Sequence, residues 1–170
     1  MAVIVETGAK VANSNSYVSR ADYIAYAATF GVTIPDTSAA DVELVTAAQY
    51  IDQHDNNLKG YKVSRDQSMS FPRVGVVIEN WQWSSAEIPR QAILCQMNFA
   101  MDVHAGRDLW NMPNNPNQTL AGFSVSGVYS ETYATASAAG QKLTRTSTGD
   151  ALLAQLLKMN GLSVVQLVRS

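Results

Sequence analysis

The sequence has 170 residues, a net charge of −2 and only 15% charged residues. This length suggests one domain, at about 100–200 residues per domain. The charge balance excludes a polycation that binds nucleic acid through net charge alone. A charged share below the usual value of about 25% suggests that partners cover part of the surface. The single cysteine, Cys95, excludes an internal disulfide, and we expect it to be a buried side chain on a helix.

The charges are spread unevenly along the chain. Residues 1–58 carry seven acidic and two basic side chains, residues 59–110 carry five and six, and residues 111–170 carry two and four. An acidic first third followed by a mildly basic remainder suits head-to-side packing of identical subunits. No apolar run reaches the ~18–20 residues of a membrane span, and the start lacks the features of a secretory signal. We therefore expect a protein of the cytoplasm, or of a particle assembled there.

Residues 1–16 are β-prone and then polar, and they predict an extended N-terminal arm with a strand at Val3–Glu6. A first helix should begin at the N-cap Ser19 and stop at Gly31. Its inner stripe is expected to consist of Ile24, Ala27 and Ala28.

A second helix should begin at Thr37 or Ser38, with acidic residues near its positive end, and should end at Gly60. Its apolar residues recur at helical spacing, which predicts one buried face. These residues are Leu44, Ala47, Ala48, Ile51 and Leu58.

The connection that follows the second helix contains Pro72, which forbids a continuing helix. A short extended piece comes next, and Ser84 with Glu87 then forms the pattern of a capping box for a third helix that ends at Gly106. That helix has a wide apolar stripe, which indicates burial on more than one side. Its members are Ile88, Ala92, Ile93, Cys95, Met97, Phe99, Ala100 and Val103.

Residues 107–148 show no helical pattern, and such long irregular runs are usually functional or disordered. Within them, "FSVSGVYSETY" alternates apolar and polar residues and predicts a strand or hairpin arm. A fourth helix should follow Ser147 or Thr148 and stop at Gly161, before a strand in "LSVVQLVRS". An arm that becomes ordered on a partner and a flexible loop both explain residues 107–148 at this stage.

The predicted fold is therefore mainly α, a small bundle of about four helices with extended β-like arms. We divide the chain into an N-terminal arm (1–16), a helical core (17–106), an extended loop or β-hairpin arm (107–148), and a C-terminal helix with a tail (149–170).

No catalytic, cofactor or metal motif stands out in the sequence. His54 and His104 are the two histidines, and neither Asp52 nor Asp55 shares a helix face with His54. A zinc site normally needs three or four ligands. We therefore expect no metal, no cofactor and no enzymatic activity.

Basic and aromatic residues alternate between the second and third helices. A single-strand binder combines a basic groove with stacking rings, so the pattern permits nucleic-acid binding. A structural interpretation is favoured, with Phe71 anchored in the core and Trp81 and Trp83 packed on one side of an extended segment. The residues of the nucleic-acid interpretation are Lys59, Lys62, Arg65, Trp81 and Trp83, with Tyr61, Phe71 and Arg73 between them.

Three segments, "SNSYVSRADYIAYAATFG", "AAQYIDQHDNNLKGYKVSRDQSMSFPRVGV" and "EIPRQAILCQMNFAMDV", occur in the order seen in a tailed-phage family. That family is often labelled DnaT-like single-stranded-DNA-binding protein. The chain also resembles the helical head-to-tail adaptors that form a ring under the portal. The resemblance covers roughly residues 13–105, and its matching residues are Tyr17, Tyr50, Asp52, Gly60, Gln67, Phe71, Pro72, Arg73, Gly75, Ile88 and Pro89.

We expect the motif residues in the connection to shape the chain rather than to carry out a reaction. Gly60 and Gly75 permit bends, Pro72 fixes its φ angle, and Gln67 can hydrogen-bond backbone groups. Arg73 offers several donors to carbonyls, or to an acid such as Asp52.

The resemblance implies a structural protein of the virion neck. It would form a ring of copies, twelve-fold to match the portal, and contact the portal and the tail or nozzle proteins. Genomic DNA would pass through the lumen without base reading, and no membrane would be involved. The alternative is a single-stranded-DNA-binding protein of phage replication.

Overall fold

The computed structural model describes residues 2–110, 118–126, 128–135 and 148–158. Its α-helices are α1 (Arg20–Thr29), α2 (Ser38–Asp52), α3 (Arg90–His104) and α4 (Thr148–Leu156), with a 3₁₀ turn, η1 (Asp55–Asn57). The strands are β1 (Tyr61–Lys62), β2 (Arg73–Val74), β3 (Val77–Ile78), β4 (Trp81–Gln82), β5 (Gln118–Ser126) and β6 (Val128–Thr135).

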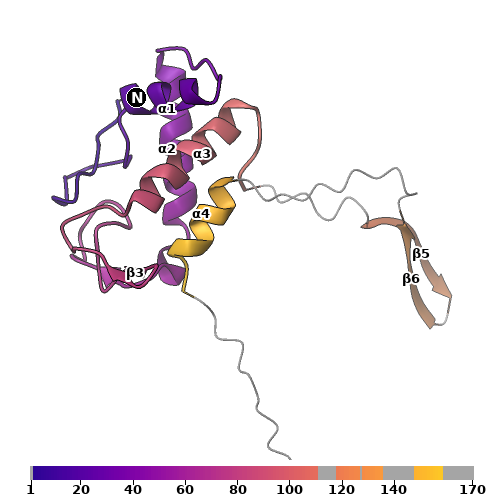
Figure 1. The fold of residues 1–170 in the computed structure, drawn as a ribbon. Coiled ribbons are helices and arrows are strands. Elements are labelled where there is room, and N and C mark those ends of the chain that lie inside the picture. The colour runs from indigo at the N-terminus through magenta and orange to yellow at the C-terminus, as the bar shows by residue number, and fades with distance from the viewer. Residues whose placement is uncertain (1, 111–117, 127, 136–147, 159–170) are drawn as a thin grey trace, which may run out of the picture.

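The helices pack around α3, which lies between α2 and α4, while α1 lies across one end (Figure 1). The apolar face predicted for the second helix is buried, from Leu44 through Ile51 to Leu58. The prediction of a small, mainly helical bundle is confirmed. No helix in the described ranges is long and apolar enough to cross a membrane.

The predicted helix starts at Ser19 and Thr37 are confirmed. The Ser19 hydroxyl accepts a hydrogen bond from the Asp22 N–H at 3.2 Å, and the Thr37 hydroxyl accepts one from the Ala39 N–H at 3.4 Å. Gly31 and Gly106 follow the ends of α1 and α3 with positive φ angles of 74° and 78°, as expected for glycines that stop a helix.

Several predicted boundaries are wrong for local reasons. The second helix ends at Asp52 rather than at Gly60, and the chain then turns through η1. The third helix begins only at Arg90, and no side chain caps it. Ile88 precedes Pro89, and a residue before a proline avoids helical angles, so the helix does not start earlier. Ser84 instead makes a turn, in which its hydroxyl accepts from the Ala86 N–H.

The N-terminal arm and α1 also differ from expectation. Instead of a strand at Val3–Glu6, the arm makes a single bridge between Val5 and Ser16. The buried carboxylate of Glu6 organises the loop that follows, since it accepts hydrogen bonds from three backbone N–H groups and from the Ser14 hydroxyl. In α1, Tyr23 and Ala27 are buried, whereas Ala28 is exposed.

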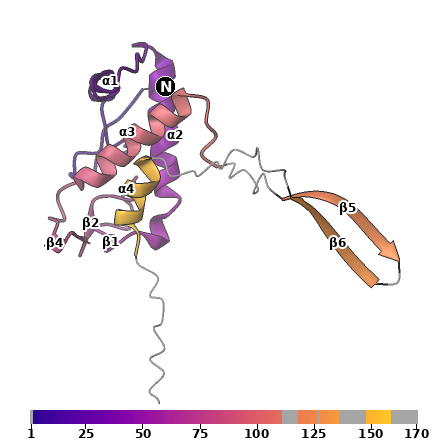
Figure 2. The ribbon, with the colours of Figure 1, turned by 45° about the vertical axis from the view of Figure 1, so that its right-hand side comes forward.

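The four short strands, which come between α2 and α3 in the sequence, form two small antiparallel sheets. β1 pairs with β2, and β3 pairs with β4 across a turn at Glu79 and Asn80, whose φ angles are 52° and 66°. Figure 2 shows β1, β2 and β4 at the same end of the molecule, with β1 and β2 nearer to α4 than β4 is. We call residues 58–83 the hairpin end.

Helix α4 is fixed to both α3 and the hairpin end. A methyl group on Gly149 would lie 2.7 Å from the ring of Phe99, so only glycine allows this close approach. The fourth helix ends at Leu156, short of the predicted Gly161, because the chain bonds to the hairpin end there. The Leu156 carbonyl accepts from the Lys59 N–H at 2.9 Å.

Strands β5 and β6 form an antiparallel hairpin, which confirms the β-like segment predicted there. The register pairs Val125 with Tyr129 and Leu120 with Tyr133, with an irregularity near Gly122. The β5–β6 hairpin has no substantial contact with a helix among the described elements. The strand predicted in "LSVVQLVRS" lies outside the described residues, and the four-part division of the chain stays a prediction.

Candidate functional site

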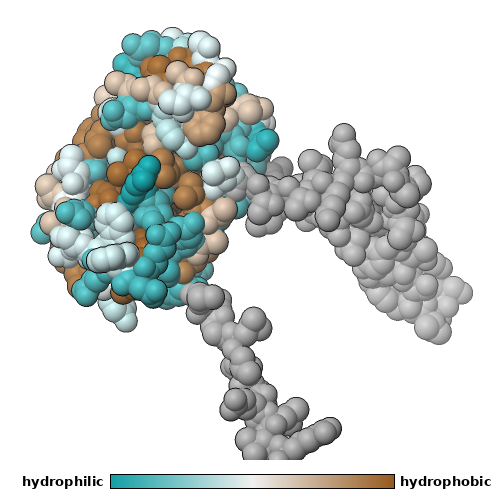
Figure 3. All heavy atoms as spheres, in the orientation of Figure 1, coloured by the Kyte–Doolittle hydropathy of each residue, from teal (hydrophilic) through white to brown (hydrophobic). Residues whose placement is uncertain are grey.

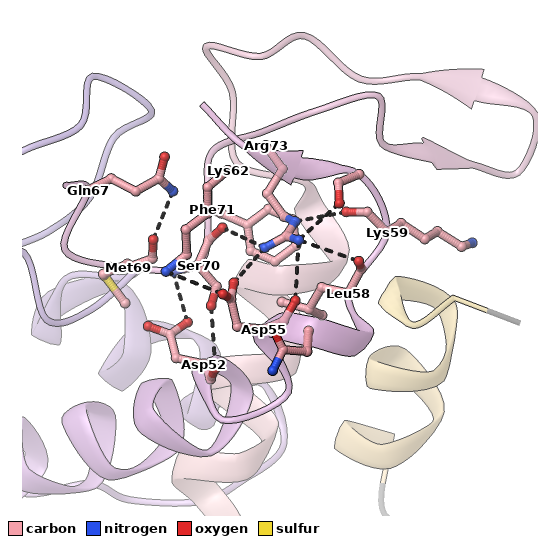
Figure 4. A network of polar contacts seen from close by, with 12 residues as sticks. Asp52, Asp55, Leu58, Lys59, Lys62, Gln67, Met69, Ser70, Phe71 and Arg73 are labelled. Carbon is pink, nitrogen blue, oxygen red and sulfur yellow. Dashed lines mark hydrogen bonds and ion pairs between the residues drawn. The ribbon is translucent and has the colours of Figure 1, made fainter. Parts of the chain in front are cut away.

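A buried guanidinium holds the connection after α2 in shape (Figure 4). Arg73 is 5% exposed, and its side chain donates to the Asp55 carboxylate at 2.6 Å. It also donates to five carbonyls, those of Asp55, Leu58, Lys59, Gly60 and Ser70, at 2.9–3.5 Å. The expectation of carbonyl acceptors agrees with this geometry, but the acid is Asp55 rather than Asp52.

Asp52 belongs to a second cluster beside the first. Its carboxylate accepts from the Tyr17 hydroxyl at 2.5 Å and from the Ser70 N–H at 3.3 Å. Burial raises the pKa of Asp52, although the bonds from Tyr17 and Ser70 and the charge of Lys62 oppose the rise. Burial and the Asp52 charge raise the pKa of Tyr17. The cluster fastens Tyr17, which directly follows the N-terminal arm, to the end of α2 and to the connection.

Gln67 and Phe71 stabilise the same connection. The Gln67 amide donates to the carbonyls of Met69 and Pro72, and its oxygen accepts from the Ser64 N–H at 3.0 Å. Phe71 is buried and makes an edge contact with the ring of Tyr17 at 5.9 Å.

The two motif glycines both have positive φ angles, but their surroundings differ. A methyl group on Gly60 would lie 2.3 Å from the Val74 carbonyl oxygen, whereas Gly75 has open space around it. Gly60 therefore allows the close approach of β1 and β2.

The remaining motif residues lie elsewhere. Tyr50 packs against Phe99 at 4.8 Å, in the core between α2 and α3. Pro89 is the N-cap of α3. Ile88 and Trp83 line a cleft of about 370 Å³ between the N-terminal arm and the start of α3. The motif therefore marks the framework of the fold.

The hairpin end also carries exposed rings and cations. Tyr61 is 75% exposed and Trp81 is 77% exposed. Lys59 and Lys62 flank Tyr61, and Arg65 is exposed in the same connection. Lys62 lies 3.4 Å from the Asp55 carboxylate, so part of its charge is balanced.

The sequence pattern did not single out Lys158. Its ammonium lies 5.8 Å from the centre of the Tyr61 ring, within reach of a cation–π contact. No local signal could have found it, because Lys158 comes from the tail of α4, far from β1 in sequence. The pattern also included two residues that are buried here, Phe71 and Arg73. Trp83 is half-buried against the core, in contrast to the exposed Trp81.

The histidines and the cysteine have structural contacts. His54 bonds the Tyr50 carbonyl at 2.9 Å. His104 lies 2.9 Å from a Glu43 oxygen, and the other oxygen of Glu43 accepts from a tyrosine of α1. Cys95 is buried, and burial raises the pKa of its thiol. Among the residues that the structure describes, no group of three or more His, Cys, Asp or Glu side chains could hold a metal ion.

The surface of the helical body mixes apolar and polar residues, as the face shown in Figure 3 illustrates.

A scan against protein families matches residues 1–170 to the family described as "Putative DnaT-like ssDNA binding protein". The chain belongs to this family. The family description names single-stranded DNA and not a place in the virion neck. Neither the search of curated proteins nor the search of solved structures found a match.

Proposed function

We propose that the protein binds single-stranded DNA through its hairpin end, without enzymatic activity. The observation that carries the proposal is the exposure of two rings, Tyr61 and Trp81, on the hairpin end. Lys59 and Arg65 belong to the same segment, and the Lys158 ammonium lies 5.8 Å from the centre of the Tyr61 ring. Bases stack on exposed rings while cations follow the phosphates. Membership of the family supports the same function.

The charge distribution indicates stacking rather than electrostatics as the main source of affinity. The whole chain carries −2, and its first third is acidic. Contact of three cations with phosphates predicts a slope of about −2 in a plot of log affinity against log salt. Rings accept any base, so we expect little sequence preference.

The test measures the anisotropy of a labelled oligothymidine during titration with the full chain. Tyr61→Ala and Trp81→Ala should each weaken binding by about 1–3 kcal/mol, the usual contribution of a stacked base. Phe30→Ala is the matched control, since Phe30, the C-cap residue of α1, is 61% exposed. Equal affinity of all three variants and the wild type would show that the hairpin end is not the binding surface.

We propose as a second candidate the head-to-tail adaptor, a ring subunit between portal and tail. One observation favours it: β5 and β6 pair only with each other among the described strands, so the outer edge of each is open to a strand from another chain. The low charged share of the sequence also suits a protein that partners cover. The ring would be twelve-fold, located in the virion, with portal, tail or nozzle proteins and passing DNA as its neighbours.

The adaptor candidate predicts a fixed place in the particle. Imaging of purified virions should show the chain as a ring between the portal and the tail. A mature particle that lacks the chain would exclude the adaptor role and leave DNA binding in replication untouched.

A further inference from the structure

The cleft between the N-terminal arm and the start of α3 has the size and the walls of a small-ligand site. Its volume of about 370 Å³ is near the lower end of the range for such sites, about 300–1,000 Å³. Among the described residues that line it, two are acids and none is Lys or Arg, so the cleft suits an uncharged ring better than a phosphate. The apolar part of its lining consists of Val5, Tyr17, Trp83, Ile88 and Ile93.

Trp83 connects this cleft to the exposed ring of Trp81. The Trp83 N–H bonds the Val76 carbonyl at 2.9 Å, which continues the β3–β4 ladder by one residue. Side chains two residues apart on a strand point to the same side, at a spacing of about 7 Å. DNA that stacks one base on Trp81 can therefore place a neighbouring base against Trp83.

Two polar side chains of the cleft meet on one rim. A methyl group on Gly8 would overlap the Ala86 carbonyl oxygen and lie 3.3 Å from the Glu87 Cα. This close approach brings Thr7 and Glu87 together, because Thr7 directly precedes Gly8. Both side chains are exposed. The rim therefore offers a carboxylate, which only accepts hydrogen bonds, beside a hydroxyl, which can also donate one.

The second acid of the cleft, Glu6, is already occupied. It is buried, and its two oxygens accept hydrogen bonds from the N–H groups of Gly8, Lys10 and Val11 and from the Ser14 hydroxyl. These bonds fill the roughly four acceptor positions of a carboxylate. Glu87 is therefore the carboxylate that the cleft offers to a ligand.

We propose that the cleft takes one base of the bound single strand and prefers guanine, an inference that rests on the proposed function. The Watson–Crick edge of guanine presents two adjacent donors, the ring N1–H and the N2 amino group, beside the O6 acceptor. The two donors match the two oxygens of the Glu87 carboxylate in a bidentate pair, and O6 can accept from the Thr7 hydroxyl.

The other bases match the rim less well. Thymine has one donor between two carbonyl oxygens, which a carboxylate repels. Adenine and cytosine present an amino group beside a ring nitrogen that only accepts. The preference concerns one nucleotide, and it adds to the sequence-tolerant stacking on Tyr61 and Trp81.

The test compares labelled oligothymidines that differ at one central position, which holds guanine, hypoxanthine or thymine. Hypoxanthine keeps the N1–H and O6 of guanine but lacks the N2 amino group. In the anisotropy titration with the full chain, the guanine strand should bind about tenfold more tightly than the thymine strand, as expected of a bidentate contact to a base. The hypoxanthine strand should lie between them.

Glu87→Gln tests the role of the carboxylate. An amide offers one acceptor and one donor, so the preference for guanine over thymine should be largely lost. Glu79→Gln is the matched control, because Glu79 is an exposed acid in the β3–β4 turn and does not line the cleft. Both variants remove one negative charge, and the ratio of two affinities cancels this common effect. Glu79→Gln should keep the tenfold preference.

Free nucleotides test the cleft independently of stacking on Tyr61 and Trp81. The indole N–H resonance of Trp83 is assigned by its loss in Trp83→Phe. It should shift in a saturable manner with deoxyguanosine monophosphate and much less with thymidine monophosphate. An oligolysine peptide is the third ligand, because an acidic rim also attracts a basic protein segment.

The outcomes separate base reading from DNA binding. If wild type binds the guanine and thymine strands equally, or if Glu87→Gln keeps the full preference, the cleft does not read guanine, although stacking at the hairpin end stands. If no strand binds, the proposed function fails. A guanine-specific shift of Trp83 would then still support the cleft as a guanine site, and its absence would overturn it. A shift with oligolysine and with neither nucleotide would assign the cleft to a basic protein segment and overturn the proposal.

Discussion

Arg73 illustrates how a buried cation can set the position of exposed side chains. Its guanidinium bonds the carbonyls of Lys59 and Gly60, the two residues directly before Tyr61. The same group bonds the Asp55 carboxylate at the end of α2. The exposed ring is therefore placed by a side chain that is itself almost fully buried.

Arg73→Ala should lower the free energy of unfolding by about 3 kcal/mol, because several carbonyls lose their donor inside the fold. Arg73→Lys should recover little, since one ammonium cannot reproduce a planar fork of donors. Urea unfolding measures both changes. Arg65→Ala, at an exposed arginine of the same connection, is the control and should stay within about 0.5 kcal/mol of wild type. A small effect of Arg73→Ala would mean that water replaces the network.

Asp52 and Asp55 should respond to pH in opposite directions. Burial raises the folded-state pKa of Asp52, so the native state gains stability relative to the unfolded chain as pH falls through that pKa. At Asp55, burial is the largest single effect and raises the pKa, but the bonds from Ser70 and Arg73 and the charges of Lys62 and Arg73 together outweigh it, so the net pKa is lowered. The stability it contributes is present above the unfolded pKa and is lost as pH falls through the folded pKa.

Asparagine variants test these signs. Asp52→Asn keeps an acceptor for Tyr17 and removes the charge, so it should be more stable than wild type at pH 7, with the difference shrinking at about pH 4. Asp55→Asn should be less stable at pH 7, with a deficit that shrinks toward about pH 3. Urea unfolding across this range measures both. If both asparagine variants were less stable than wild type at pH 7, the opposite pKa shifts given to Asp52 and Asp55 would be wrong.

At the scale of elements, one amide joins three segments. The Gln96 oxygen accepts from the Tyr17 N–H at 2.8 Å, and its nitrogen donates to the Leu44 carbonyl at 2.9 Å and the Ser16 hydroxyl at 2.7 Å. The N-terminal arm, α2 and α3 therefore meet at a buried side chain with all of these bonds satisfied.

Gln96→Leu should destabilise the fold by about 1–3 kcal/mol, because the Tyr17 N–H is left without its acceptor in the core. Gln91→Leu is a matched substitution on the same helix. The Gln91 oxygen is buried and has no hydrogen-bond partner among the residues that the structure describes, so its replacement should be neutral or stabilising. Thermal unfolding of the two variants compares them directly. If Gln96→Leu and Gln91→Leu lost the same amount of stability, the hydrogen bonds of the Gln96 amide would contribute nothing beyond the volume of the side chain.

The sequence predicted the elements whose signals are local. Ser19 and Thr37 cap helices through side chains close in sequence, and glycines with positive φ follow two helix ends. The failures arose where distant contacts decide. Leu156 ends α4 by bonding the hairpin end, and Lys158 joins Tyr61 only through the fold. The choice of Asp55 over Asp52 as the partner of Arg73 depends on how η1 turns, which spacing alone does not determine.

At the scale of the whole molecule, the two candidate functions use different parts of the chain. DNA binding requires Tyr61 and Trp81 at the hairpin end, whereas ring assembly depends on the open edges of β5 and β6. Because β5 and β6 have no substantial contact with a described helix, the two parts can be changed separately.

Replacement of residues 118–135 by a glycine–serine linker should therefore leave the unfolding free energy of the helices within about 0.5 kcal/mol of wild type. DNA affinity should also be unchanged, whereas any self-association driven by the strand edges should be lost. Light scattering, urea unfolding and oligothymidine binding measure the three properties. Tyr61→Ala with Trp81→Ala is the reciprocal variant, with weak DNA binding and normal association. Loss of helical stability in the linker variant would show that β5 and β6 pack on the helices. The division of function between the hairpin end and the β5–β6 strands would then be wrong.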